Sequence, residues 1–237
     1  MLRRRFVIAG LMAVSLPAPN FGTEADEPMQ HVVLLGDSIF ENAAYVAPGE
    51  EVIRKLKQQL PAGFQASLLA RDGAVIADVA NQLTGLPADA THLVVSVGGN
   101  DALLNAGILE ESATSMADAL TQLRSVRDGF RADYDAMLGA VLRQNLPTAI
   151  CTIYDAQLPD PEQRELAAVA LTVLNDVITR SAVTRRLPLI DLRVIFSHSS
   201  DYANAIEPSG QGGRKLAAAI LELLQRHDFH GPAAFYA

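Results

Sequence analysis

The sequence predicts an α/β fold in which helices cover both faces of a parallel sheet. Apolar, β-rich runs alternate with helical patterns from His31 onward, and this alternation is typical of repeated strand-helix-strand units. With 237 residues, the chain can bury a full hydrophobic core in one such domain, and a second domain is not required. Strands are predicted at residues 31–36, 64–70, 91–97, 148–154 and 188–192.

Helices are predicted where apolar residues recur at helical spacing between these strands. The longest pattern runs from Met116 to Val141 and indicates one long helix or two helices joined near Gly129. The last helix is expected after Pro208, with Ser209 as its N-cap, because a serine side chain can accept hydrogen bonds from the first free backbone N–H groups. Other helices are predicted near residues 52–60, 75–83 and 161–181.

Composition and charge favour a small, uncharged substrate. The chain carries 19 Lys and Arg against 27 Asp and Glu, a net charge of -8, whereas nucleic acids and anionic membranes are bound by basic surfaces.

Cys151 is the only cysteine, so an internal disulfide and a thiolate metal cluster are excluded, and its apolar neighbours predict a buried side chain. No cluster of His, Asp and Glu has metal-ligand spacing, and we expect no metal and no other cofactor. The sequence carries no signal for an oligomeric state.

Residues 1–28 are predicted to be a signal peptide or an N-terminal extension that precedes a domain of residues 29–237. Arg3, Arg4 and Arg5 precede the apolar run FVIAGLMAVSLPA, and a polar stretch then leads into the first strand. The apolar run is too short for a permanent transmembrane helix, so no stable membrane span is expected. A periplasmic or secreted location is the favoured prediction, and the alternative is a cytoplasmic protein that starts at Met29.

Polar residues with useful chemistry follow the ends of the predicted strands. Ser38 in GDSIF follows the first strand, Gly73 follows the second, and Asn100 in GGND follows the third. In a parallel α/β sheet these carboxyl ends border the ligand crevice. Each motif alone is typical of an ordinary turn. Together they supply a hydroxyl nucleophile, a backbone N–H and a side-chain amide, which acyl transfer uses for attack and for stabilising the oxyanion.

In these blocks, and in Pro208 and Ser209 near the C-terminus, the sequence resembles the SGNH (GDSL-type) hydrolase family. The resemblance extends from residue 31 to about residue 226. It implies a flavodoxin-like, three-layer α/β/α sandwich with a five-stranded parallel sheet. It also implies a hydrolase in which Ser38 is the nucleophile, while Gly73, Asn100 and the Ser38 backbone N–H hold the oxyanion.

The last block departs from the family pattern at the general base. Family members usually carry Asp-x-x-His-Pro-Ser, whereas this chain has Asn204 and Glu207 at the Asp and His positions. An aspartate would stabilise an imidazolium but repel a glutamate, so the two replacements are consistent with each other. We therefore interpret Glu207 as a carboxylate base acting on Ser38, held by a hydrogen bond from Asn204 or by nearby donors. His198 is the alternative base, with Asp201 to orient it.

Three further residues near these motifs are assigned structural roles. Asp37 is expected to bond loop backbone, with its side chain pointing away from the nucleophile, and Asp101 is expected to act similarly. Tyr154 closes the fourth predicted strand, where packing or capping is favoured over a place in the pocket wall.

The leading functional prediction is a serine hydrolase of esterase or lipase type that cleaves small carboxylic esters through an acyl-enzyme on Ser38. The alternative is a non-catalytic member of the same fold that binds an acyl or acetyl ligand. A flavodoxin-like protein that binds a phosphate cofactor is disfavoured, because the first strand-end loop lacks a glycine-rich cradle. The sequence does not specify the acyl or the alcohol group.

Overall fold

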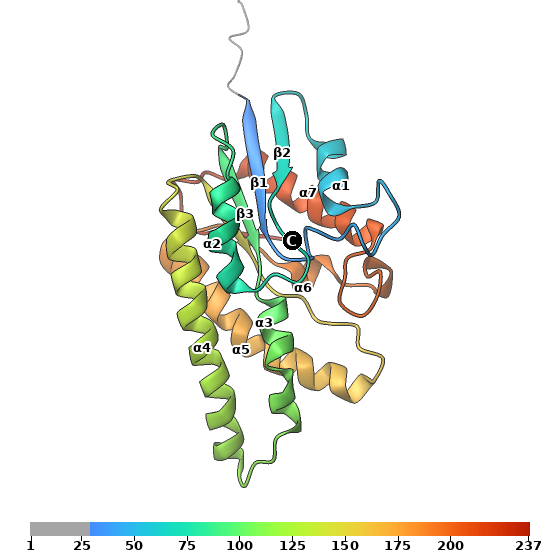
Figure 1. Ribbon diagram of the computed structural model, residues 1–237, viewed down its shortest axis with the longest axis vertical. Helices are drawn as coiled ribbons and strands as arrows, with labels where there is room; N and C mark the ends of the chain where they lie inside the picture. Colours follow the sequence, from blue (N-terminus) through green and yellow to red (C-terminus); the bar gives the residue numbers. More distant parts are fainter. Residues whose placement is uncertain (1–28) are drawn as a thin grey trace, which may run out of the picture.

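A six-stranded parallel sheet forms the centre of the protein, in a computed structural model that describes residues 29–237 (Figure 1). The strands lie in the order β2-β1-β3-β4-β5-β6, and every pairing is parallel. The predicted fold class is therefore confirmed. The strands are β1 (Gln30–Gly36), β2 (Phe64–Leu68), β3 (His92–Ser96), β4 (Thr148–Cys151), β5 (Leu189–Ile190) and β6 (Phe235–Tyr236).

The sheet has one strand more than the five that were predicted. The extra strand is β6, in which Phe235 and Tyr236 pair with Leu189 and Ile190 of β5 at the sheet edge. A strand of two residues near the end of the chain has no alternation that a sequence pattern could reveal.

Helices cover both faces of the sheet, which confirms the three-layer arrangement. Successive residues of β1 point to opposite faces. Leu34 therefore packs in one core with Leu56 and Leu216, whereas Leu35 packs in the other core with Leu138. The first layer contains α1 (Val52–Gln59), α6 (Leu192–Ile195) and α7 (Gly210–Arg226), and the second contains α2 (Val79–Gln82), α4 (Met116–Leu142) and α5 (Pro161–Arg185).

The long helices follow the sequence prediction closely. α4 runs without a break through Gly129, so the pattern after β3 is one helix. Ser209 caps α7 as predicted, because its side chain accepts hydrogen bonds from the backbone N–H groups of Gln211 and Gly212. The segment predicted at 75–83 is less regular, since 3-10 turns flank the short α2. These turns are η1 (Ile76–Asp78) and η2 (Leu83–Gly85).

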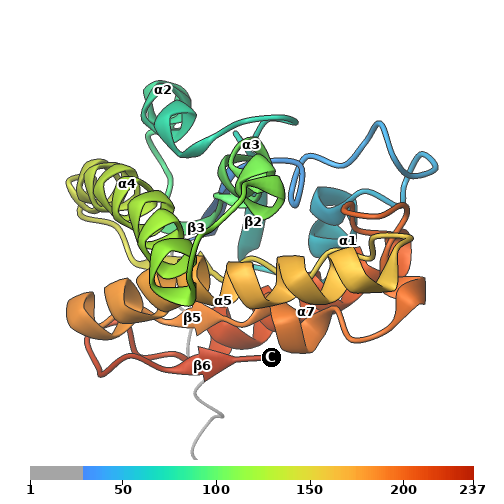
Figure 2. The same ribbon diagram turned by 90° about the horizontal axis from the view of Figure 1, so that it is seen from below.

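Three helices extend beyond the carboxyl end of the sheet and build one side of the site. α3 (Gly99–Leu104) and η3 (Ala106–Glu110) connect β3 to α4. Figure 1 shows α3 and α4 extending past the end of the sheet, and Figure 2 shows α5 beside them. α5 has the length and hydropathy of a membrane-spanning helix, but core helices meet the same criterion, and α5 packs against α4 and β4.

Two other predictions concern the ends and the core of the chain. The predicted signal segment, residues 1–28, lies outside the described residues. Cys151 is buried and unpaired, as predicted, and burial raises the pKa of its thiol. The thiol is therefore an inert part of the core.

Candidate active site

Ser38 lies in a tight turn that directly follows β1. The Asp37 carbonyl accepts hydrogen bonds from the backbone N–H groups of Phe40 and Glu41, at 3.1 Å each, and the Asp37 carboxylate accepts one from Ile39 N–H at 3.1 Å. Ser38 is 7% exposed and forms part of the wall of a pocket, called here the central pocket. The GDS motif is therefore a hydrogen-bonded turn that holds Ser38 at the pocket wall.

Gly36 determines how closely β1 and β3 approach at this edge of the sheet. Its φ of +128° lies in the region that favours glycine, and a Cβ atom there would lie 1.7 Å from the carbonyl oxygen of Ser96. The Gln82 side chain holds the same residue, accepting from Gly36 N–H at 2.8 Å and donating to its carbonyl oxygen at 2.7 Å. The turn that carries Ser38 is thereby kept next to the end of β3.

Asn100 lies in the first turn of α3, directly after β3, and borders the central pocket. Its side-chain amide donates to the Ala74 carbonyl at 2.9 Å, which leaves the second amide N–H without a partner among residues 29–237. Asp101 accepts a hydrogen bond from Ile76 N–H at 3.0 Å, so its predicted structural role is confirmed.

Gly73 lies next to Ala74, the residue to which Asn100 is bonded, and has a φ of +74°. It borders a neighbouring cleft with Arg71 and Asp72, and it is not among the residues that line the central pocket. Of the two predicted oxyanion donors outside the Ser38 turn, only Asn100 therefore contributes to the pocket wall.

Glu207 lies in a short loop, residues 202–208, which we call the base loop. The Glu207 carbonyl accepts a hydrogen bond from Ala203 N–H at 2.8 Å, and the Asn204 side-chain oxygen accepts from the N–H groups of Ile206 and Glu207, at 2.9 Å each. We expected Asn204 to donate to the Glu207 carboxylate. Instead its oxygen fixes the backbone that carries Glu207, a local turn contact that asparagine readily makes.

The Glu207 carboxyl group is buried beside Ser38 in the wall of the central pocket. Glu207 is 4% exposed, and its Oε2 has no hydrogen-bond partner among the described residues. Burial raises the pKa of Glu207 to about 7; the neighbouring Ser38 side chain lowers it, and the charges of Asp72 and Glu41 raise it further. The structure thus brings together the predicted nucleophile, one oxyanion donor and the predicted base.

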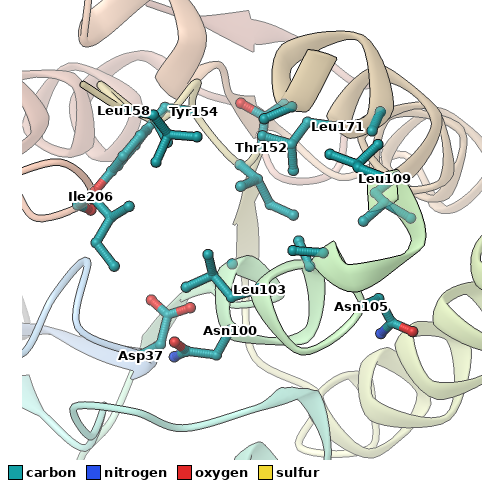
Figure 3. Close-up of a pocket in the computed structure, with 18 of the residues that line it drawn as sticks. Asp37, Asn100, Leu103, Asn105, Leu109, Thr152, Tyr154, Leu158, Leu171 and Ile206 are labelled. Atoms are coloured by element: carbon teal, nitrogen blue, oxygen red, sulfur yellow. The ribbon is translucent and has the colours of Figure 1, made fainter. Parts of the chain in front are cut away.

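Asp37 is a second buried carboxyl group in the same pocket wall. Burial raises its pKa to about 7, the hydrogen bond from Ile39 N–H lowers it, and the charge of Glu207 raises it. The predicted backbone bond is present, and the side chain, which was predicted to point away from the nucleophile, borders the same pocket as Ser38. Figure 3 shows Asp37 beside Asn100 at the edge of the pocket, because the turn after Gly36 rotates the side chain out of strand alternation.

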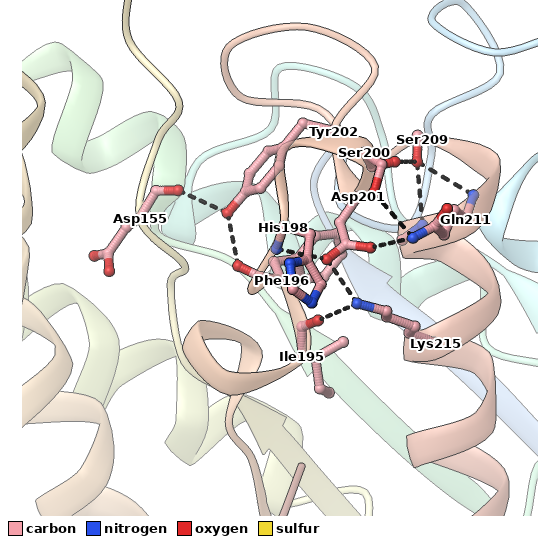
Figure 4. Close-up of polar contacts among 11 residues, drawn as sticks. Asp155, Ile195, Phe196, His198, Ser200, Asp201, Tyr202, Ser209, Gln211 and Lys215 are labelled. Carbon is pink, nitrogen blue, oxygen red and sulfur yellow. Dashed lines mark hydrogen bonds and ion pairs between the residues drawn. The ribbon is translucent and has the colours of Figure 1, made fainter. Parts of the chain in front are cut away.

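Asp201 anchors the segment that leads into the base loop (Figure 4). Its buried carboxylate accepts hydrogen bonds from His198 N–H at 3.0 Å, Gln211 at 3.1 Å and Lys215 at 2.7 Å. Burial raises the pKa of Asp201, but these partners, Lys215 foremost, outweigh that effect and hold it below its usual value. The His198 side chain is exposed and lies outside the central pocket, so Asp201 binds its backbone and not its ring.

Asn42 links the turn of Ser38 to the base loop. Its side chain is fully buried, donates to the Pro208 carbonyl at 3.0 Å and accepts from Val52 N–H at 3.0 Å. Sequence reasoning missed this residue because a single asparagine in a loop belongs to no periodic or spaced pattern.

Tyr154 provides a second link, from the end of β4. Its hydroxyl donates to the carbonyl of Ile206, and its ring packs against Phe196 and Tyr202 with centroid distances of 4.5 and 5.3 Å. The predicted packing role is confirmed, and Tyr154 also lines the central pocket, which was the less favoured alternative. Figure 4 shows the related contact of Tyr202, whose hydroxyl lies 2.9 Å from the Asp155 carbonyl.

The central pocket has a volume of about 370 Å³, a size typical of small-molecule sites. Ser38, Asn100 and Glu207 border it at the carboxyl end of the sheet, and α3, η3, α4 and α5 supply most of the remaining wall. Figure 3 shows Leu109 beside Leu171 at one end of the pocket and Leu103 nearer to Asp37 and Asn100.

A parallel sheet between two helical layers, with a serine-containing turn after the first strand, defines the class of α/β/α hydrolases. The chain belongs to the GDSL-like lipase/acylhydrolase family, whose family model matches residues 34–228. This finding confirms the resemblance that the GDSIF and GGND motifs indicated. No curated protein sequence matches the chain.

Solved structures with the same fold include several ester hydrolases. An extracellular lipase from Streptomyces rimosus has a TM-score of 0.62 at 16% identity, over 83% of this chain and 98% of its own. The aryl esterase of M. smegmatis has a TM-score of 0.60 at 15% identity, over 83% of this chain and 98% of its own. An acetyl xylan esterase, AlAXEase, has a TM-score of 0.58 at 18% identity, over 79% of this chain and 96% of its own. At these identities the similarity shows the fold.

Proposed function

We propose that this protein is a serine hydrolase of carboxylic esters, with Ser38 as the nucleophile and Glu207 as the general base. The family and the esterase and lipase structures with the same fold support ester hydrolysis in general. The observation that carries the residue assignment is the Glu207 carboxyl group, buried next to the Ser38 hydroxyl at the pocket that Asn100 also borders.

The proposed reaction has two steps. In the first, Ser38 Oγ attacks the acyl carbon while its proton passes to Glu207, and the intermediate then expels the alcohol, which takes that proton. In the second, Glu207 removes a proton from a water molecule that attacks the acyl-enzyme, and returns it to Ser38 as the acid leaves. The bonds formed and broken balance without a metal or a redox partner.

The raised pKa of Glu207 provides the basicity that a glutamate in water would lack. The ordinary side-chain pKa is 4.5 for glutamate and about 6.5 for histidine. Burial raises the pKa of Glu207 to about 7, so the carboxylate accepts a proton about as readily as an imidazole would. Replacement of the usual histidine is therefore compatible with base catalysis.

The oxyanion is proposed to be held by the Ser38 backbone N–H, the free N–H of the Asn100 amide and Gly73 N–H. The Asn100 amide is oriented by its bond to the Ala74 carbonyl, which supports this role. Gly73 follows from the family resemblance, and its position next to Ala74 keeps it near Asn100.

A fluorophosphonate probe and p-nitrophenyl acetate test the nucleophile. We expect wild type to be labelled and to hydrolyse the ester, and Ser38→Ala to do neither. Ser197→Ala is the matched control, because Ser197 is exposed and lies outside the central pocket. Equal background in wild type and Ser38→Ala would refute the proposal and favour the non-catalytic ligand-binding alternative.

The rival base is tested in the same assay with His198→Ala. The exposed position of His198, outside the central pocket, leads us to expect hydrolysis close to wild type. A loss comparable to that of Glu207→Gln would transfer the base assignment to His198.

A further inference from the structure

Beyond Ser38, the central pocket continues as an apolar channel between α3, η3 and α5. Leu103 and Leu109 line it from one side, and Leu166, Ala170 and Leu171 line it from α5. The lining residues of α5 run from 163 to 174, so about 16 Å of that helix borders the channel. Such a length suits an extended chain better than a compact group.

Three leucines of this channel are exposed even though they line a cavity. The exposed fractions are 48% for Leu103, 43% for Leu109 and 49% for Leu166. They come from three different elements, and all three line the same channel. Apolar side chains left open to solvent around one channel mark a binding surface. An apolar ligand in the channel would cover them, whereas the folded chain alone does not.

Beyond Asn100, the lining between α3, η3 and α5 is mostly aliphatic, and its polar side chains are Asn105, Glu110 and Gln163. Asn105 is a lining residue, but its amide donates to the Asp101 carbonyl of its own helix at 2.8 Å. Tyr154 is the only aromatic residue in the lining among residues 29–237; its hydroxyl is bonded to the Ile206 carbonyl and its ring packs against Phe196. A sugar would therefore find no free aromatic platform for stacking here.

We infer that this channel binds the acyl chain of medium- and long-chain esters, with the ester carbonyl at Ser38. The inference rests on the proposed function for the placement of the carbonyl. The leaving alcohol must receive its proton from Glu207, so it departs on the side of the base loop, whereas the channel continues on the side of α3 and α5. The acyl part of the ester is therefore the part that the channel accommodates.

The first experiment measures kcat/KM for p-nitrophenyl esters from acetate to decanoate. Each methylene group that enters the channel is expected to raise kcat/KM about fourfold, the effect of burying one such group. Ethyl decanoate and decyl acetate, which are isomers, are compared in the same way, and ethyl decanoate is expected to be the better substrate. A preference for acetate over longer acyl groups, or for decyl acetate, would overturn the inference and leave the proposed function intact.

The second experiment narrows the channel from α5. Ala170→Phe places a ring in the channel, and the decanoate-to-acetate ratio of kcat/KM is expected to fall about fifteenfold, the effect of losing two methylene contacts. Val169→Phe is the matched control, since Val169 is the next residue on α5, is 64% exposed and does not line the pocket. Equal ratios in the two variants would contradict the channel.

A binding measurement separates the channel from the chemistry. Ser38→Ala is titrated with the neutral fluorescent probe N-phenyl-1-naphthylamine, and ethyl decanoate, but not ethyl acetate, is expected to displace it. A neutral ligand is needed because the carboxyl groups of Asp37 and Glu207 border the pocket. If ethyl decanoate displaces the probe from Ser38→Ala but not from the double variant Ser38→Ala/Ala170→Phe, the channel is supported. This holds even if wild type hydrolyses no ester, and in that case only the proposed function fails. Absence of displacement would overturn the channel.

Discussion

Asp201 and Glu207 are buried carboxylates in adjacent parts of one loop region, yet their surroundings are opposite. Asp201 has Lys215, Gln211 and a backbone N–H as partners, and its pKa is lowered. Glu207 has one oxygen without any partner among the described residues, and burial raises its pKa to about 7. A fully partnered carboxylate fixes the loop, whereas a poorly partnered one remains able to accept a proton.

This difference supports the proposal that Glu207 acts as the base at a position where the family usually has histidine. Asp201 and the Asn204 turn fix the backbone of the loop, and the carboxyl group of Glu207 is the part that the proposed function uses as a base. The energetic cost of burying Glu207 is the source of its raised pKa.

Removing the base should give the largest effect. We expect Glu207→Gln to lower kcat by about 10²- to 10⁴-fold, the usual contribution of a general base, and to abolish the acidic limb of the pH-rate profile, which in wild type is centred near pH 7. Glu41→Gln is the control, because this carboxylate also raises the pKa of Glu207 but does not line the pocket. Full activity with an unchanged acidic limb in Glu207→Gln would show that both carboxylates of the comparison are structural.

Removing the negative charge of Asp201 should mainly lower the stability of the fold. Asp201→Asn removes the charge that pairs with Lys215, and the free energy of unfolding in urea at pH 7 is expected to fall by about 3 kcal/mol. Because the pKa of Asp201 is lowered in the folded state, this stabilisation is present above the ordinary pKa and is lost in acid. Asp176→Asn, which breaks an exposed ion pair with Arg180, should change stability little. Equal effects of the two substitutions would argue against an anchoring role.

Stability should depend on pH in the opposite sense at Glu207. Its pKa is raised in the folded state, so its contribution is fully present below its ordinary value of 4.5 and is lost as the pH rises through about 7. At pH 8 the free energy of unfolding in urea should therefore be about 2 kcal/mol higher for Glu207→Gln than for wild type. At pH 4 the two free energies should be equal. Circular dichroism at the two pH values measures this, and a gain of equal size at both would exclude a titration effect.

The smallest effect is expected from Asn204→Asp, which restores the acidic residue of the family pattern. Because position 204 is exposed, solvent and salt partly screen the added charge. The apparent pKa of the acidic limb of the pH-rate profile should therefore rise by about half a pH unit. Added salt should reduce the shift. A downward shift would indicate that the new carboxylate does not act on Glu207 through its charge.

Much of the fold follows from local pattern. The apolar runs of β1 and β3, the start of α5 and the Ser209 cap of α7 depend on neighbouring residues, and they lie close to where the sequence predicts them. β6 is missed because its two residues pair only through a contact distant in sequence. The 3-10 turns around α2 are missed because their apolar spacing imitates a regular helix.

The site is predictable where a motif marks it and unpredictable where only tertiary contact does. Ser38, Asn100 and Glu207 stand in recognisable blocks, and the structure places them around one pocket. The linking role of Asn42 and the position of Asp37 at the pocket depend on the contact between the turn after β1 and the base loop. No residue spacing in the sequence indicates that contact.

The close contact between Gly36 and Ser96 has a consequence for directed evolution. Any side chain at position 36 would force the two central strands apart, and the hydroxyl and the amide that they carry would separate with them. In a saturation library selected for ester turnover, this codon should return glycine alone, although the residue itself never meets the substrate.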